Sequence, residues 1–139
     1  MKTVGSVSEF QELINTPGKL VVVDYFASWC GPCRKIAPFF EELSGRYPDV
    51  LFLKVQQDGE GGDICRMAGI SAFPTFKFYI NGTEKMELKG ASPQKLEEAI
   101  NFQHALAVLP PSVFVCAVVL GVVGAAAVAS LLLIRHHRR

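Results

Sequence analysis

The feature that most constrains the fold is a pair of nearly continuous apolar runs. Residues 20–27 read LVVVDYFA and residues 50–56 read VLFLKVQ, and both runs are rich in β-branched and aromatic side chains. Such runs are typical of strands that are buried on both faces, as in sheets covered by helices on either side. Residues 6–15 and 33–46 alternate with the two runs and show the apolar spacing of helices. Ser6 and Glu9 have the spacing of a capping box at the start of the first helix. This order predicts an α/β protein with a central sheet.

The later elements complete a mixed sheet with helices on both faces. They are predicted as a short helix at 63–69, a β-hairpin of residues 74–80 and 84–89 joined by Asn81-Gly82-Thr83, and a last helix opened by Ser92 and Pro93 with Leu96, Ala99, Ile100 and Leu106 facing inward. A short strand at Thr3-Val4 adds an edge to this sheet. About 105 residues are enough for one such core, so a single domain is expected.

The charge of the chain argues against one class of partner. The formal net charge is +1 over 139 residues. Proteins that bind nucleic acids carry a basic patch or stripe, and no such feature stands out in this sequence. Nucleic acid is therefore not expected among the partners.

After residue 106 the composition becomes almost entirely apolar. The stretch from Val113 to Ile134 contains no charged residue, and at ~1.5 Å per residue a helix of this length spans roughly 33 Å, enough to cross a bilayer. We predict a domain at 1–106, a linker at 107–112, a transmembrane helix at 113–134 and a basic tip at 135–139 that includes His136 and His137. Small residues form one stripe of the span, at Ala117, Gly121, Ala125 and Ala129. The stripe permits a homodimer through the membrane helix, although modest hydrophobicity also explains it.

The position of the span predicts where the domain works. The first residues, MKTVGSVSEF, show no signal or transit pattern, and only the basic tip follows the span. We expect a tail anchor that is inserted after synthesis, with the domain in the cytosol. An Ala- and Gly-rich span with a basic tip favours the mitochondrial outer membrane, and the endoplasmic reticulum is the alternative. The positive-inside rule argues for the opposite orientation, because the basic residues lie beyond the span.

Cys30 and Cys33 directly follow the first apolar run, and their spacing has three explanations. A zinc site needs four nitrogen or sulfur ligands, and the other two of the four cysteines, Cys65 and Cys116, form no second pair of this spacing. Scaffolds held by structural disulfides are small, cysteine-dense and secreted. A redox-active pair is therefore favoured over a metal site or a structural disulfide.

The position of the pair suits a reaction in two steps. With Cys30 at the end of a strand and a helix starting at Gly31 or Pro32, the Cys30 sulfur faces unpaired N–H groups and the positive end of the helix dipole, which favour a thiolate. Cys33 comes one helical turn later and is expected to be deeper and more shielded. This asymmetry suits a nucleophile at Cys30 and a resolving thiol at Cys33, which attacks the mixed disulfide.

The segment VDYFASWCGPCRKIAP resembles the active site of the thioredoxin family, and the likeness extends over residues 1–106. The positions that match in order and spacing are Asp24, Trp29 to Cys33, Pro38, Lys54, Pro74-Thr75 and Gly90-Ala91. The resemblance implies the thioredoxin fold, which is a central mixed β-sheet flanked by helices. It also implies a protein-disulfide reductase with a redox disulfide between Cys30 and Cys33.

The resemblance further implies roles for residues around the pair. Asp24 is implied as a buried proton acceptor for Cys33, with Lys54 as its charge partner, and a solvated edge position is the other interpretation of Asp24. Pro74 is implied to be cis, which turns the Phe73 backbone toward an extended substrate. The substrate-binding residues, here called the docking collar, are Trp29, Gly31, Pro32, Phe73, Pro74, Gly90 and Ala91. No bound cofactor or metal is implied, and electrons come from an external reductase or a small dithiol.

Some features depart from the family pattern or stay unassigned. Phe73 is bulkier than the usual residue, Arg34 replaces a commoner lysine, and the loop at 59–62 is one residue longer and is expected to be more flexible, which leaves substrate choice open. Cys65 is predicted to be a buried small hydrophobe, and Cys116 to be buried in lipid or at a helix contact. A redox-inert scaffold of a membrane complex and a lumenal disulfide isomerase are the alternative functions.

Overall fold

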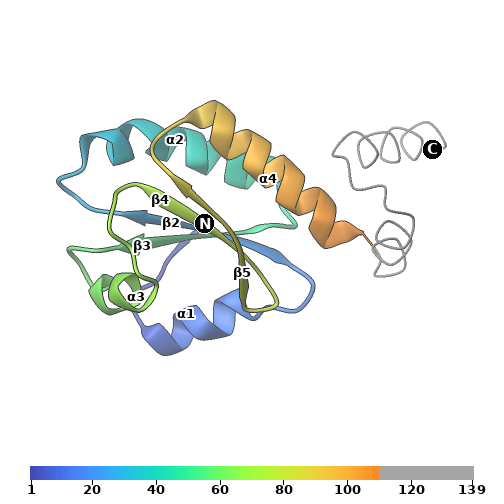
Figure 1. Cartoon of the computed structure of the whole chain (residues 1–139), viewed down its shortest axis with the longest axis horizontal. Coiled ribbons are helices and arrows are strands. Elements are labelled where there is room, and N and C mark those ends of the chain that lie inside the picture. The colour runs from blue at the N-terminus through green and yellow to red at the C-terminus, as the bar shows by residue number, and fades with distance from the viewer. Residues whose placement is uncertain (110–139) are drawn as a thin grey trace. The chain divides into compact units, whose positions relative to one another are not determined.

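The computed structural model describes residues 1–109, which form a five-stranded sheet with helices on both faces (Figure 1). In chain order the elements are β1 (Lys2–Thr3), α1 (Val7–Ile14), β2 (Leu20–Phe26), α2 (Gly31–Arg46), β3 (Leu51–Gln56), α3 (Gly62–Met67), β4 (Thr75–Ile80), β5 (Thr83–Lys89) and α4 (Pro93–Val108). The strand order is β1-β3-β2-β4-β5, with β2 parallel to β3 and antiparallel to β4. The mixed sheet and its flanking helices, predicted from the sequence, are confirmed.

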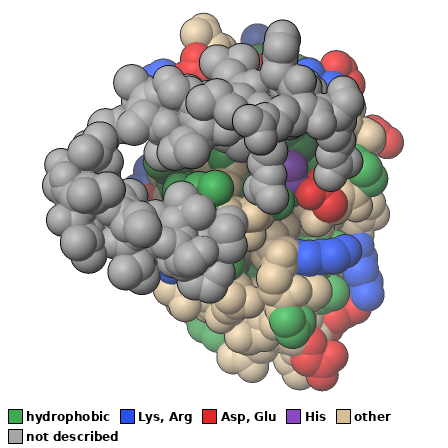
Figure 2. All heavy atoms as spheres, turned by 90° about the vertical axis from the view of Figure 1, so that its right-hand side faces the viewer, with side chains coloured by type: hydrophobic (Ala, Val, Ile, Leu, Met, Phe, Trp, Pro, Cys, Tyr) green, Lys and Arg blue, Asp and Glu red, His purple; other side chains and the backbone are tan. Residues whose placement is uncertain are grey.

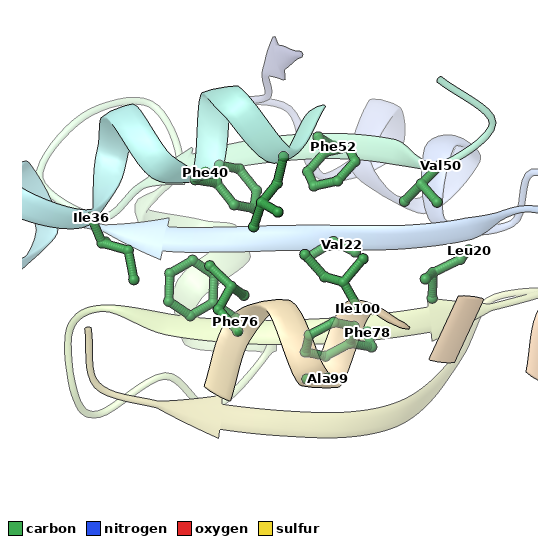
Figure 3. Close-up of a cluster of buried hydrophobic side chains, with 12 residues drawn as sticks. Leu20, Val22, Ile36, Phe40, Val50, Phe52, Phe76, Phe78, Ala99 and Ile100 are labelled. Atoms are coloured by element: carbon green, nitrogen blue, oxygen red, sulfur yellow. The ribbon is translucent and has the colours of Figure 1, made fainter. Parts of the chain in front are cut away.

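The central strand β2 is buried on both faces because helices pack on either side of it. Figure 3 shows one face, where Val22 of β2 lies among side chains from α2, α4 and the neighbouring strands. The cluster on this face comprises Leu20, Val22, Ile36, Phe40, Leu43, Val50, Phe52, Phe76, Phe78, Leu96, Ala99 and Ile100. Burial of these apolar side chains holds α2 and α4 against the sheet.

The other face of β2 packs under α1 and α3, because successive side chains of a strand point to opposite faces. The cluster there comprises Val4, Phe10, Ile14, Val21, Val23, Tyr25, Leu53, Val55, Ile64, Cys65 and Tyr79. The hydroxyl groups of Tyr25 and Tyr79 lie 2.8 Å apart and satisfy each other inside this cluster. Cys65 is a free, buried cysteine of the same cluster, as predicted.

Local capping signals account for where two helices begin. The Ser6 hydroxyl accepts a hydrogen bond from the Glu9 amide at 3.5 Å and caps α1. At α4 the Ser92 hydroxyl accepts from the Lys95 amide at 3.4 Å. Each cap satisfies one of the N–H groups that the first turn of a helix leaves unpaired. Both caps were predicted from the sequence.

The hairpin between β4 and β5 turns through two residues with left-handed backbones. Asn81 has φ of 50° and Gly82 has φ of 78°, which is the pairing that a tight two-residue hairpin turn requires. The Gly82 amide also donates to the Ile14 carbonyl at 2.9 Å. The turn is therefore docked on the C-terminal end of α1.

Polar contacts join the C-terminal end of α2, and the loop after it, to α4. Arg46 Nη1 donates to Glu97 Oε1 at 2.8 Å. Beyond the helix, His104 Nε2 lies 2.6 Å from Asp49 Oδ2. The two helices run in the same general direction in Figure 1, and the Arg46–Glu97 contact places the end of α2 beside the first half of α4.

The C-terminal end of α4 differs from the prediction in two ways. The helix continues to Val108, so the first two residues of the predicted linker at 107–112 are helical, and the compact unit comprises Met1–Val108. Leu106 was predicted to face inward but is only half-buried, whereas Gln103 is buried. The reason is helical spacing, because the stripe that continues from Ile100 passes through Gln103 and Ala107.

The predicted transmembrane helix at 113–134 and the basic tip at 135–139 lie outside the described residues. Within residues 1–109, none of the helices is both long and apolar enough to cross a bilayer. Acidic and basic side chains are mixed on the face of the molecule shown in Figure 2, in keeping with the net charge near zero.

Candidate active site

The cysteine pair lies where the central strand ends and α2 begins. β2 ends at Phe26, and Cys30 is the N-cap residue of α2, with its Sγ accepting a hydrogen bond from the Cys33 amide at 3.2 Å. The two cysteines form a disulfide and their Cα atoms are 5.3 Å apart. An amide of the first helical turn therefore points at the Cys30 sulfur, which favours a thiolate at this position once the disulfide is reduced.

Neither cysteine is accessible in this oxidised state. Cys30 and Cys33 are each 4% exposed, so the predicted difference in shielding is absent while the two sulfurs are bonded. Phe26 and Phe73 are partly buried and pack against them. The exposed surface beside Cys30 belongs instead to Trp29, which is 65% exposed.

The docking collar brings together segments that are far apart in the sequence. The Trp29 and Phe73 rings meet edge to face, with their centroids 5.8 Å apart. The peptide bond between Phe73 and Pro74 is cis, as the resemblance implies. The Gly90 amide donates to the Pro74 carbonyl at 3.0 Å, and Gly90 has φ of 96°, a left-handed conformation that favours glycine.

The other collar positions flank these residues. Gly31 and Pro32 form the first turn of α2, where Gly31 is half-buried and Pro32 is exposed. Ala91 is half-buried and packs against the core under α4. The Ala91 side chain is therefore shared between the collar and the core.

Asp24 is buried in the middle of β2, on the face that α2 covers. Every second side chain of a strand points to the same face, so Asp24 lies on the same face as Leu20 and Val22. Asp24 is 1% exposed. Its Oδ1 has no hydrogen-bond partner among the described residues. Burial raises the pKa of this carboxyl to about 7, partly offset by the positive charge of Lys54. The solvated edge position considered for Asp24 is therefore wrong.

Lys54 is the neighbour of Asp24 across the sheet. The two residues are paired in register between the parallel strands β2 and β3. The Lys54 ammonium lies 4.6 Å from the centroid of the Phe26 ring, a cation–π contact at the end of β2. Lys54 therefore acts on Asp24 through its charge and has a second contact close to the cysteine pair.

Sequence reasoning missed Asp58, in the glycine-rich loop that was expected to be flexible. The loop is closed by hydrogen bonds, because the amides of Gly59 and Gly61 both donate to the Gln56 carbonyl, at 3.3 and 3.1 Å. Asp58 Oδ1 accepts from the Ser28 amide at 3.0 Å. No local pattern signals this contact, since the two residues are far apart in the sequence.

The arrangement can exchange electrons with a second disulfide, because the two cysteines are close enough to form a disulfide and an amide of the first turn of α2 points at Cys30 Sγ. Within residues 1–109, no cluster of three or more His, Cys, Asp or Glu side chains is placed to hold a metal ion. The sulfurs of Cys30 and Cys33 are the reactive atoms that this geometry offers.

Comparisons with known proteins agree on one family. The thioredoxin family model matches residues 2–102. Thioredoxin of Ophiophagus hannah is 45% identical over 101 residues, which cover 72% of this chain and 95% of that protein. Thioredoxin-1 of Schizosaccharomyces pombe is 47% identical over 100 residues, with the same coverage of 72% and 95%.

Solved structures give the same result for the fold. The X-ray structure of Fasciola hepatica thioredoxin has a TM-score of 0.70 and 40% sequence identity, and the match covers 73% of this chain and 97% of that one. Plasmodium falciparum thioredoxin gives a TM-score of 0.69 at 42% identity, covering 73% and 97%. The family match contains every residue of the candidate active site and ends before residue 113.

Proposed function

The chain belongs to the thioredoxin family, and we propose that it reduces protein disulfides through Cys30 and Cys33 while residues 113–134 anchor it to a membrane. Thioredoxins are thiol–disulfide oxidoreductases that need no bound cofactor, and this chain is an enzyme of that type. The observation that carries the proposal is the hydrogen bond from the Cys33 amide to Cys30 Sγ within the Cys30–Cys33 pair.

In the proposed reaction the reduced pair passes two electrons to a substrate disulfide. The Cys30 thiolate attacks one substrate sulfur and forms a mixed disulfide, while the other substrate sulfur leaves as a thiolate and takes a proton. Cys33 gives its proton to Asp24 and attacks Cys30 Sγ. The second substrate sulfur leaves and is protonated in turn, and the Cys30–Cys33 disulfide remains. An external reductase or a small dithiol then returns two electrons and two protons.

The setting of Asp24 supports its part in the second step. A carboxyl with a pKa of about 7 can both take and release a proton at neutral pH. Within residues 1–109 its Oδ1 has no hydrogen-bond partner, which leaves a lone pair free for that proton. Lys54, through its charge, limits how far burial raises the pKa of Asp24.

The mechanism is tested with cysteine variants in insulin reduction, with dithiothreitol as electron donor. Cys30→Ser should abolish reduction, because the attacking sulfur is gone. Cys33→Ser should stall with substrate bound to Cys30, and the adduct should run as a shifted band on a non-reducing gel. Cys65→Ala is the matched control and should retain activity, since Cys65 is buried in the core away from the pair. Full turnover by Cys33→Ser without an adduct would refute the two-thiol mechanism.

The membrane part of the proposal is supported by the sequence. Residues 113–134 carry no charge and are rich in Ala and Gly, and the residues after them are basic. We propose the mitochondrial outer membrane, with the domain in the cytosol, and the endoplasmic reticulum is the alternative. If the wild-type chain were inactive with all protein disulfides, the redox-inert scaffold would become the better description.

A further inference from the structure

Ser28, two residues before the nucleophile, is held by two charged side chains. Asp58, in the loop after β3, accepts hydrogen bonds from the Ser28 amide at 3.0 Å and from the Ser28 hydroxyl. Arg34, in the first turns of α2, donates from Nη1 to the Ser28 carbonyl at 2.8 Å. The backbone N–H, the backbone C=O and the hydroxyl of Ser28 thus all have partners. Ser28 itself is exposed, so burial does not fix its position.

Asp58 is itself positioned by the fold. Gln56 Nε2 donates to Asp58 Oδ1 at 3.2 Å. The Gln57 amide donates to the Phe26 carbonyl at 2.9 Å, which ties the start of this loop to the end of β2. Hydrogen bonds from Ser28 and Gln56 lower the pKa of the Asp58 carboxyl, so Asp58 is charged at neutral pH. An ionised carboxylate makes stronger hydrogen bonds than a neutral group.

The residue that these contacts control is Trp29. Trp29 follows Ser28 directly, is 65% exposed, and meets the Phe73 ring edge to face. A side chain this exposed gains little from burial, so its orientation depends on the backbone that carries it. That backbone is fixed on one side by the bonds of Ser28 and on the other by Cys30, the N-cap of α2.

We infer that Asp58 and Arg34 are positioning residues for substrate docking, which act through Ser28 to hold Trp29 against Phe73 beside Cys30. This inference rests on the proposed function, since it concerns how a protein disulfide meets the same dithiol. Neither side chain takes part in sulfur exchange. Their loss should weaken the binding of a protein substrate, which needs the ordered collar, and should leave a small disulfide almost unaffected.

The test compares two substrates with Asp58→Ala and Ser28→Ala in the full chain. Loss of one such hydrogen bond should raise the KM for insulin about fivefold. The kcat with insulin and the rate with dipyridyl disulfide, a small uncharged probe, should change less than twofold. Ser28→Thr keeps the hydroxyl and should restore the insulin KM. Arg34→Lys keeps the charge beside Cys30 while replacing the guanidinium, so any rise in KM reports on positioning.

A spectroscopic readout separates positioning from general stability. Trp29 is the single tryptophan of the chain, so fluorescence anisotropy reports on this side chain alone. Asp58→Ala should lower the anisotropy, whereas Asp63→Ala should not, because Asp63 is an exposed carboxylate of α3 paired with Arg66. Unchanged insulin KM and unchanged anisotropy in folded variants would overturn the inference, as would equal losses with both substrates. A wild-type chain that reduced neither substrate would instead refute the proposed function.

Discussion

A carboxyl group in the middle of an apolar strand is costly to ionise, and Asp24 is such a group. Burial raises its pKa from 3.8 to about 7. One pKa unit corresponds to about 1.4 kcal/mol, so ionised Asp24 destabilises the fold by on the order of 4 kcal/mol. Such a group persists in a core when it serves a reaction, which fits the proposed acceptance of a proton from Cys33.

The sign of the pH dependence follows from this shift. Well below pH 3.8, the pKa of Asp24 in the unfolded chain, this carboxyl is protonated in both the folded and the unfolded chain, so it has no effect on pH dependence there. Between pH 4 and 7 the folded chain binds more protons, and the contribution of Asp24 to stability falls as pH rises. Asp24→Asn should therefore match wild type at pH 4 and be more stable at pH 8 by roughly 2–4 kcal/mol in urea unfolding of the oxidised form.

An exposed carboxyl provides the control for this prediction. Glu12→Gln on α1 replaces an exposed carboxyl without altering the core, and should not reproduce the gain in stability at pH 8. A difference between Asp24→Asn and wild type that stayed constant from pH 4 to 8 would contradict a buried, titrating Asp24. In single-turnover assays Asp24→Asn should slow the resolution step by Cys33 more than the initial attack by Cys30.

How far the site could be predicted depends on how local each signal is. Cys30 and Cys33 share one helical turn, and Asp24 stands out as a charge inside an apolar run. The cysteine pair and Asp24 could therefore be found from short sequence patterns. Asp58 was not found, because its contact with Ser28 forms only when the loop after β3 closes beside the end of β2. The equal burial of the two cysteines also has no sequence signal, since it belongs to the disulfide state.

Among the elements, the hairpin of β4 and β5 depends most visibly on one residue. Gly82 has a left-handed backbone, and a Cβ added to it would clash with the Asn15 side chain. Gly82→Ala should therefore destabilise the domain by ~1–2 kcal/mol from backbone strain alone, measured by urea unfolding. The clash at the end of α1 adds to this loss.

Gly45 in α2 is the matched control for the same substitution. It is exposed and lies inside a helix, and a Cβ added to it would meet nothing within 4 Å apart from its chain neighbours and the nearby backbone of its own helix. Alanine is a better helix former than glycine, so Gly45→Ala should stabilise the domain by ~0.5–1 kcal/mol. If both variants changed stability in the same direction, the account of the turn would be wrong.

Elements were predicted well where caps and turns mark their ends and less well where such marks are absent. Ser6 and Ser92 fix the starts of α1 and α4, and Asn81-Gly82 fixes the hairpin. The end of α4 carries no comparable signal, and the helix runs two residues beyond the predicted limit. The burial of Gln103 was unexpected because apolar periodicity gives no reason to place an amide in the core.

For the whole molecule the decisive question is whether residues 113–134 enter a bilayer. Arginine at the centre of a membrane helix costs about 2.5–3.5 kcal/mol on insertion scales. Val123→Arg should therefore shift the chain from the carbonate-resistant membrane pellet toward the soluble fraction, while Val123→Leu should leave it in the pellet. Recovery of the wild-type chain in the soluble fraction would exclude the anchor but not the redox chemistry.

The arrangement of α2 and α4 has a practical consequence for handling this enzyme. α2 is 16 residues long, so Cys30 lies roughly 24 Å of helix away from Arg46. Arg46 contacts Glu97, and the last turns of α4 carry the chain roughly 16 Å further to Val108. The end of α4 at Val108 is thus remote from the reactive sulfur of Cys30. A reporter protein or surface linkage joined just after Val108 should leave substrates free to approach Trp29 and Cys30.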